Sequence, residues 1–287
     1  MQIKEQILNG LTGKVSALQV GDPRGRPILA IHGWMDNAAS FIPLARQLNH
    51  YNWFCIDLPG HGKSEHRPIG SVYHLTDYVI DLLSIMDSLE WERCDLIGHS
   101  LGAGIGSIFS ATFPEKVNHL VLIDGIGPVS HNDDRVPGQI RKAGESHLMR
   151  KQMSMKSPKG YESWDQLISS RQVAGKIAAQ NAELLVRRAA SERFDKVFVN
   201  SDKRLREPSF LYMSQGQVCQ ILGGIECPVL LIQALSGFVI QRETTLERID
   251  AIPDIDVANL PGNHHLHMDT PEPVGAEIDR FLLQKKK

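Results

Sequence analysis

The sequence lacks the features that mark membrane and secreted proteins. No window approaches the about 18–20 apolar residues of a membrane span, and the apolar stretch at residues 229–232 has only the length of a strand. Residues 1–8 contain no apolar core of the kind that a signal peptide has. No CxxC pair occurs among the four cysteines, which suits buried thiols in a reducing compartment. They are Cys55, Cys94, Cys219 and Cys227. We therefore expect a cytoplasmic protein.

The chain also lacks an excess of charge of either sign. It has 31 basic and 33 acidic residues, a formal net charge of −2, so we expect neither nucleic acid nor a membrane as a partner. No GxGxxG fingerprint, P-loop or internal repeat occurs. The HxxH spacing of His264 and His267 is a weak metal signal without a matching carboxylate cluster. We expect no cofactor and no metal, and the oligomeric state stays open.

The first half of the chain has the pattern of an α/β protein. Its 287 residues suffice for one large domain or for a core with an insert. Short, nearly continuous apolar runs are typical of parallel strands that are covered on both faces. Such runs occur at residues 27–31, 53–58, 94–97 and 119–123, with a helical pattern at 75–89 and an antiparallel hairpin at 3–8 and 15–20. We expect a mostly parallel sheet flanked by helices.

A polar block interrupts this alternation. From residue 129 to about residue 226 the chain is rich in Lys, Arg, Ser and Gln and predicts helices and loops without a clear strand. Strand and helix patterns then return at residues 228–233, 242–249, 256–260 and 274–283. The sequence therefore predicts a core made of residues 1–128 and 227–287, with a helical cap inserted at 129–226.

The strongest chemical signal is the motif Gly98-His99-Ser100-Leu101-Gly102, which lies between a predicted strand and an apolar helix. A serine on a sharp strand-to-helix turn needs small residues two positions before and after it, because the backbone there is strained. Gly98 and Gly102 meet that need. The turn lifts the Ser100 hydroxyl above the sheet edge, beside a helix N-terminus that favours a developing negative charge. Ser100 is therefore the candidate nucleophile.

An acyl-transfer serine also needs two main-chain donors directed at an oxyanion. One is the amide of Leu101, which follows the nucleophile in the chain. The second is expected from the loop His32-Gly33-Trp34 after an earlier strand, where Gly33 lets the backbone approach closely and the Trp34 amide donates. The alternative interpretation of this loop is a tight strand exit.

A histidine on a late loop is the usual base for such a serine. The loop after the last predicted strand contains three, His264, His265 and His267. We expect His264 to accept the proton from Ser100, and His265 and His267 to line or support the loop.

These motifs together resemble the α/β-hydrolase superfamily over nearly the whole chain, and most closely its serine hydrolase-like subgroup. In that superfamily the histidine follows the small residues of its loop, which supports His264 over His265. The resemblance is carried by His32-Gly-Trp-Met-Asp-Asn37, Asp57-Leu-Pro-Gly-His-Gly-Lys-Ser64, Thr112-Phe-Pro-Glu115, Val229-Leu-Leu-Ile232, Pro261-Gly-Asn-His264 and Pro271-Glu-Pro273.

The position of the catalytic acid differs from the commonest pattern of the superfamily. Most members have an Asp just past the strand that follows the cap, where this chain has Ser236 and Gly237. The resemblance therefore favours Asp124, because some relatives, including a subtype of haloalkane dehalogenases, have their acid after the preceding strand. A capping role for Asp124 and a Ser-His dyad are the alternatives. Poorer candidates for the acid are Asp254, Asp256 and Glu243.

The resemblance implies a serine hydrolase of carboxylesterase type that acts on small or medium acyl esters through an acyl-enzyme. Relatives that use an alkyl-enzyme have an aspartate at the position of Ser100. A thioesterase, a C–C bond hydrolase and a perhydrolase stay open, because the same triad serves them all. From another class, a hydrolase-like ligand receptor with little turnover stays open too.

The predicted cap should determine the substrate. Its methionines and aromatic residues are expected either to line an acyl pocket or to form the buried face of the cap itself. They are Met149, Met153, Met155, Trp164 and Phe194. Its arginines and lysines mark either a site for an anionic substrate or a solvated face. They are Arg187, Arg188, Lys203, Arg204 and Arg206.

Overall fold

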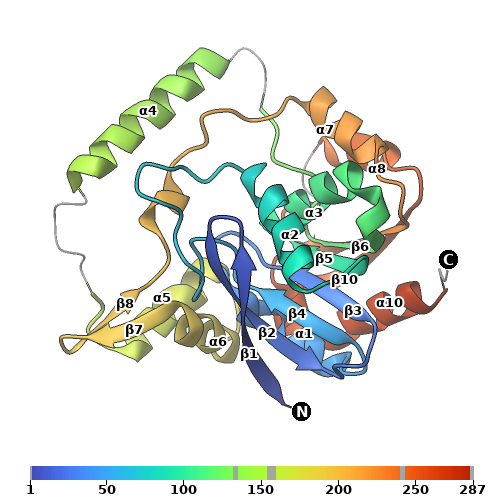
Figure 1. Ribbon diagram of the computed structural model, residues 1–287, viewed down its shortest axis with the longest axis horizontal. Helices are drawn as coiled ribbons and strands as arrows, with labels where there is room; N and C mark the ends of the chain where they lie inside the picture. Colours follow the sequence, from blue (N-terminus) through green and yellow to red (C-terminus); the bar gives the residue numbers. More distant parts are fainter. Residues whose placement is uncertain (1, 132–134, 154–159, 240–242, 285–287) are drawn as a thin grey trace.

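The computed structural model describes residues 2–131, 135–153, 160–239 and 243–284, and an eight-stranded sheet forms its centre (Figure 1). The strands lie in the order β1-β2-β4-β3-β5-β6-β9-β10. Within this sheet, only the β1–β2 and β2–β4 pairs are antiparallel. The bounds are β1 (Ile3–Gly10), β2 (Gly13–Gly21), β3 (Pro27–Ile31), β4 (Asn52–Ile56), β5 (Cys94–His99), β6 (Val117–Ile123), β9 (Val229–Ser236) and β10 (Ile255–Asn263). This confirms the predicted mostly parallel sheet.

Helices cover both faces of the sheet, as the continuous apolar strands predict. In β3, Leu29 and Ile31 belong to one buried apolar cluster while Ile28 and Ala30 belong to the other, because successive side chains point to opposite faces. One face is covered by α2 (Asp77–Ser88), α3 (Leu101–Thr112), α7 (Gln215–Gly223) and α8 (Thr245–Asp250). The other is covered by α1 (Ile42–Gln47), α9 (Leu266–Asp269) and α10 (Pro271–Gln284). In the described part of the chain, no helix combines the length and the apolarity that crossing a bilayer requires.

The described residues between β6 and β9 add no strand to the main sheet. They form α4 (Val136–Met153), α5 (Trp164–Gly175), α6 (Ala179–Ala189) and α7, and Figure 1 shows α4 as an outlying helix. They also form a small hairpin, β7 (Ala190–Arg193) and β8 (Lys196–Val199), which the sequence did not predict. Its two-residue turn has φ of 52° at Phe194 and 56° at Asp195. Such a turn usually contains Asn-Gly or Asp-Gly, so the Phe-Asp pair gave no signal.

A buried ion pair joins α6 to the sheet. The Arg188 guanidinium lies 2.9 Å from both carboxylate oxygens of Asp57, and it also pairs with Glu5 at 2.9 Å. Asp57 in addition accepts hydrogen bonds from the amides of Ala38 and Lys63. Arg188 is therefore neither on a solvated face nor available to an anionic substrate, the two interpretations that the sequence left open.

Candidate active site

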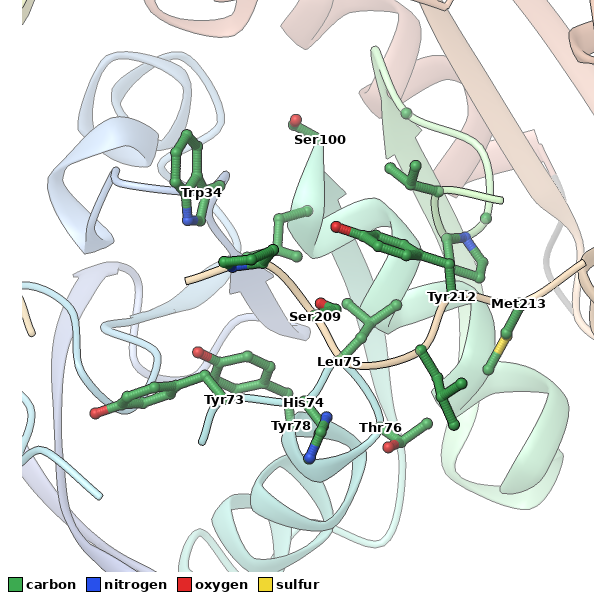
Figure 2. Close-up of a pocket in the computed structure, with 18 of the residues that line it drawn as sticks. Trp34, Tyr73, His74, Leu75, Thr76, Tyr78, Ser100, Ser209, Tyr212 and Met213 are labelled. Carbon is green, nitrogen blue, oxygen red and sulfur yellow. The ribbon is translucent and has the colours of Figure 1, made fainter. Parts of the chain in front are cut away.

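Ser100 lies on the turn between β5 and α3 with φ 52° and ψ −109°, a conformation that non-glycine residues rarely adopt. Two glycines make this turn possible. A Cβ on Gly98 would lie 2.4 Å from the Gly102 carbonyl oxygen, and one on Gly102 would lie 2.0 Å from the Ile31 carbonyl oxygen. The strained turn presents Ser100 to a cavity of about 1010 Å³, as Figure 2 shows.

His264 directly follows β10 and lines the same cavity. Its Nδ1 lies 2.5 Å from Oδ2 of Asp124, which follows β6 and has a fully buried side chain. Because a carboxylate only accepts hydrogen bonds, Nδ1 carries the proton and Nε2 is left free to act as a base. The Phe238 ring packs against the imidazole at a centroid distance of 4.2 Å. The structure thus places a carboxylate–imidazole pair at the wall of the cavity that Ser100 lines.

The Asp124 carboxylate is held by the turn after β9, where the superfamily usually has its acid. The Phe238 amide donates to Oδ2 at 2.9 Å and the Val239 amide to Oδ1 at 3.5 Å. Of the poorer candidates from the sequence, Asp254 and Asp256 lie at the amino end of β10, opposite to His264. Glu243 is exposed.

The two predicted oxyanion donors both line the cavity. Leu101 is the first residue of α3, so its amide has no carbonyl one turn earlier within the helix. The Trp34 loop is fixed by His32, whose Nε2 accepts from the Leu58 amide at 3.0 Å and whose Nδ1 donates to the Gly33 carbonyl at 2.7 Å. The Trp34 indole donates to the Leu205 carbonyl at 2.9 Å, which joins this loop to the segment after β8.

Two buried histidines support the His264 loop from behind. The His99 Nε2 donates to the His264 carbonyl at 2.8 Å, and burial lowers the pKa of His99 well below its usual value. His267 is fully buried against the Phe41 ring, and burial lowers its pKa to about 3. Both are therefore neutral at pH 7. Within the described residues, no group of three or more His, Cys, Asp and Glu side chains is arranged to hold a metal ion.

Asp36 connects three parts of the site, and the sequence did not single it out although it lies in the His32–Asn37 motif. It lies 3.3 Å from the His265 Nε2 and pairs with Arg171 of α5. Burial alone would raise the pKa of Asp36, but His265 and Arg171 outweigh that effect and hold the pKa well below its usual range. Asp36 thus links the Trp34 loop, the histidine loop and α5.

The residues predicted to line an acyl pocket lie elsewhere. Met149 is 64% exposed and Phe194, on the β7–β8 turn, is 92% exposed. Trp164 donates to Glu192 at 3.1 Å and packs under the Arg187 guanidinium. None of these three is among the residues that line the described cavity. Met155 and the side chain of Met153 lie outside the described residues.

Three segments form most of the cavity wall instead, and they are irregular apart from the end of a short 3₁₀ helix at Lys203–Arg206. Residues 73–76 precede α2, residues 125–129 follow β6, and residues 205–214 precede α7. Loops carry no hydrophobic period, so no sequence pattern indicated that these three segments meet. Arg206 is the one residue of the predicted basic set that lines the described cavity.

Comparison with known proteins identifies the family to which this chain belongs. A family model described as alpha/beta hydrolase fold matches residues 26–271. The chain is 30% identical to serine hydrolase-like protein 2 from Homo sapiens, over 94% of this chain and 91% of that protein. It is 29% identical to a serine hydrolase-like protein from Danio rerio, over 91% of this chain and 83% of that protein.

Solved structures share the fold. The crystal structure of a hypothetical protein from Pseudomonas aeruginosa superposes with a TM-score of 0.89 at 32% identity, covering 97% of this chain and 98% of that one. A thioesterase domain from a curacin biosynthetic pathway superposes with a TM-score of 0.83 at 20% identity, covering 97% of this chain and 99% of that one. At 20% identity, the match to the thioesterase domain shows a shared fold and indicates nothing about activity.

Proposed function

This chain belongs to the alpha/beta hydrolase fold family, in its serine hydrolase-like group, and from that premise we propose that it hydrolyses acyl esters with Ser100, His264 and Asp124 as its catalytic triad. The observation that carries the proposal is the 2.5 Å contact between Asp124 and His264 at the wall of the cavity that Ser100 lines. A capping role for Asp124 would not require a histidine partner on the cavity side.

The proposed reaction has two halves. The Ser100 hydroxyl attacks the ester carbonyl carbon while the His264 Nε2 takes its proton, and the buried Asp124 carboxylate stabilises the resulting imidazolium. The amides of Trp34 and Leu101 donate to the oxyanion. His264 then protonates the leaving alcohol, and an acyl-enzyme remains on Ser100. A water molecule, deprotonated by His264, hydrolyses that intermediate and restores the serine.

Small or medium acyl esters are the proposed substrates, which places the activity among the carboxylesterases. A serine nucleophile supports acyl transfer over alkyl-enzyme chemistry, because an acyl-serine is readily hydrolysed whereas an alkyl ether is not. Three of the four cysteines are buried, which supports the cytoplasmic location that we include in the proposal.

Hydrolysis of p-nitrophenyl butyrate by the wild type, with Ser100→Ala as control, tests the proposal. We expect turnover that Ser100→Ala abolishes, together with covalent labelling of the wild type by a fluorophosphonate. Absence of both from the wild type would contradict the proposal and favour a hydrolase-like binding protein. Labelling without butyrate turnover would support an activated serine and would indicate that the enzyme acts on a different ester.

A further inference from the structure

The cavity beside Ser100 is larger than a short acyl group needs. Its volume of about 1010 Å³ lies at the upper end of the about 300–1,000 Å³ that is usual for ligand pockets. In Figure 2, Ser100 lies at one end of the drawn lining and Tyr73, His74 and Thr76 at the other, with Leu75 and Ser209 between. An acetyl or butyryl group on Ser100 would leave most of this space unused.

The wall offers apolar surface to whatever fills the cavity. Apolar side chains that line the cavity include Leu75, Leu101, Ile126, Val129, Phe210 and Met213. The Glu207 carboxylate at the wall is neutralised within the protein, because it pairs with the Arg150 guanidinium at 3.0 Å. The Tyr73 hydroxyl is also engaged, since it donates to Asp202 at 2.8 Å. Arg206 is exposed, so its guanidinium can stay in water.

One side of the cavity, residues 205–214, is fixed at both ends. At its start the Arg204 guanidinium donates to the carbonyls of Arg67, Pro68 and Ser71 at 2.6–2.8 Å and pairs with Asp202. At its other end the Met213 carbonyl accepts from the His131 amide at 3.0 Å. A wall held in this way needs little ordering when a ligand binds, so the buried apolar area contributes more fully to affinity.

We propose that this cavity is an acyl-chain pocket for uncharged esters of medium to long chain, and that Arg204 is the positioning residue that keeps it open. This inference rests on the proposed function, because it assigns the acyl half of the substrate to the cavity that Ser100 lines. The pocket predicts that esters with acyl chains longer than butyrate are the preferred substrates.

A series of p-nitrophenyl esters from acetate to laurate tests the chain length. Burial of one CH₂ is worth about 0.8 kcal/mol, so kcat/KM should rise about fourfold per carbon until the cavity is full. An ester of the same length that ends in a carboxylate should react more slowly than its uncharged analogue. A series that is flat or highest at acetate would overturn the proposal. A faster carboxylate-ended ester would overturn the uncharged class and favour recognition by Arg206.

Two pairs of variants test the wall. Leu75→Trp, which fills part of the cavity, should lower kcat/KM for the decanoate at least tenfold and leave the acetate within about twofold. Leu148→Trp, at a 63% exposed position of α4, is the matched control and should change neither. Arg204→Gln should raise KM for the decanoate alone, whereas Lys203→Gln, at the exposed neighbouring residue, should not. Equal losses on acetate and decanoate in Leu75→Trp and Arg204→Gln would overturn the role of the pocket.

Binding without turnover separates this inference from the proposed function. The ketone 2-undecanone carries a similar chain with no scissile bond, and its affinity for the Ser100→Ala variant can be measured by calorimetry. Saturable binding that Leu75→Trp weakens at least tenfold would support the pocket even if no ester is hydrolysed. Absence of binding would overturn the pocket, while Ser100-dependent turnover of acetate would still support the proposed function.

Discussion

Gly237 lies so close to the carboxylate of Asp124 that a Cβ at position 237 would stand 2.3 Å from its Oδ1. The same turn donates the Phe238 amide to Oδ2 of this carboxylate. The turn therefore has no acid of its own. Instead, Gly237 leaves space for the carboxylate of Asp124, which follows the neighbouring strand, and the Phe238 amide donates a hydrogen bond to it. Asp124 and Gly237 form one arrangement, because the carboxylate can lie there only while residue 237 has no side chain.

Gly237→Ala should displace the Asp124 carboxylate from the His264 Nδ1. We expect kcat for p-nitrophenyl butyrate to fall about 100-fold or more with KM changed little, because the loss is in the transition state. The overpacking itself should lower stability by about 1–3 kcal/mol, which thermal unfolding measures. Gly223→Ala is the control, since its Cβ would meet nothing closer than 3.4 Å. An unchanged kcat would show that this carboxylate does not act.

Asp124→Asn should lower kcat by about 10³–10⁴-fold while the protein stays folded. The amide keeps the shape of the carboxylate but neither stabilises the imidazolium nor fixes the tautomer with the proton on Nδ1. Steady-state kinetics on p-nitrophenyl butyrate, with circular dichroism for the fold, provides the measurement. Asp254→Asn, at the rival position, should leave kcat unchanged. A loss smaller than tenfold in Asp124→Asn would favour a Ser-His dyad.

Replacing the two adjacent histidines should have opposite consequences. His264→Ala should lower kcat about 10³-fold or more, because the base is lost. His265→Ala should change kcat less than tenfold but lower the free energy of unfolding by about 1–3 kcal/mol, because the buried Asp36 loses a partner. Kinetics and urea denaturation of both variants give the ranking. The reverse ranking would identify His265 as the base.

The core could be predicted from the sequence because its signals are local. A continuous apolar run predicted both ends of β3 correctly. The apolar helical pattern predicted the first and last residues of α2 to within two positions. The motifs placed Ser100 and His264 at the carboxyl ends of their strands. Asp124 and His264 are 140 residues apart. Attention was directed to Asp124 only by the missing acid at Ser236 and Gly237 and by the resemblance to relatives whose acid follows the preceding strand.

The region between β6 and β9 resisted prediction for physical reasons. Helical spacing of Met149 and Met153 indicates a helix face but not whether that face meets the core, and Met149 proved to be exposed. Arg188 and Asp57 pair across 131 residues, and no local pattern encodes such a contact. The segment at residues 205–214 follows an irregular path without a hydrophobic period, so its place at the cavity could not be inferred from sequence.

Arg188→Ala should destabilise the protein far more than Arg187→Ala. Removal of Arg188 leaves the fully buried Asp57 carboxylate without its cation, which should cost about 3–5 kcal/mol. Arg187 pairs with Glu183 on the exposed face of α6, so its removal should change stability by about 0.5 kcal/mol or less. Urea denaturation of both variants measures the difference. Equal effects would show that the buried pair does not hold α6 to the sheet.

Buried neutral histidines should make the protein sensitive to mild acid. Burial lowers the pKa of His61 and His267 to about 3 and that of His99 well below its usual value. In the unfolded chain each has a pKa of about 6.5. Below pH 6.5 the unfolded chain therefore binds protons that the native state does not bind. The free energy of unfolding should fall as the pH falls from 6.5 toward 3, by up to about 4 kcal/mol per pH unit for three histidines.

The contribution of His267 can be isolated. Neither of its ring nitrogens has a hydrogen-bond partner within the described residues, so His267→Leu removes a titrating group without breaking a hydrogen bond. Urea denaturation from about pH 7 to about pH 5 gives the slope of the free energy of unfolding against pH. Below about pH 6 this slope should be reduced by nearly one proton, or about 1.4 kcal/mol per pH unit. His50→Gln, which removes an exposed histidine, is the control. An unchanged slope in His267→Leu would mean that His267 titrates alike in the folded and unfolded chain, and would exclude a buried neutral imidazole at that position.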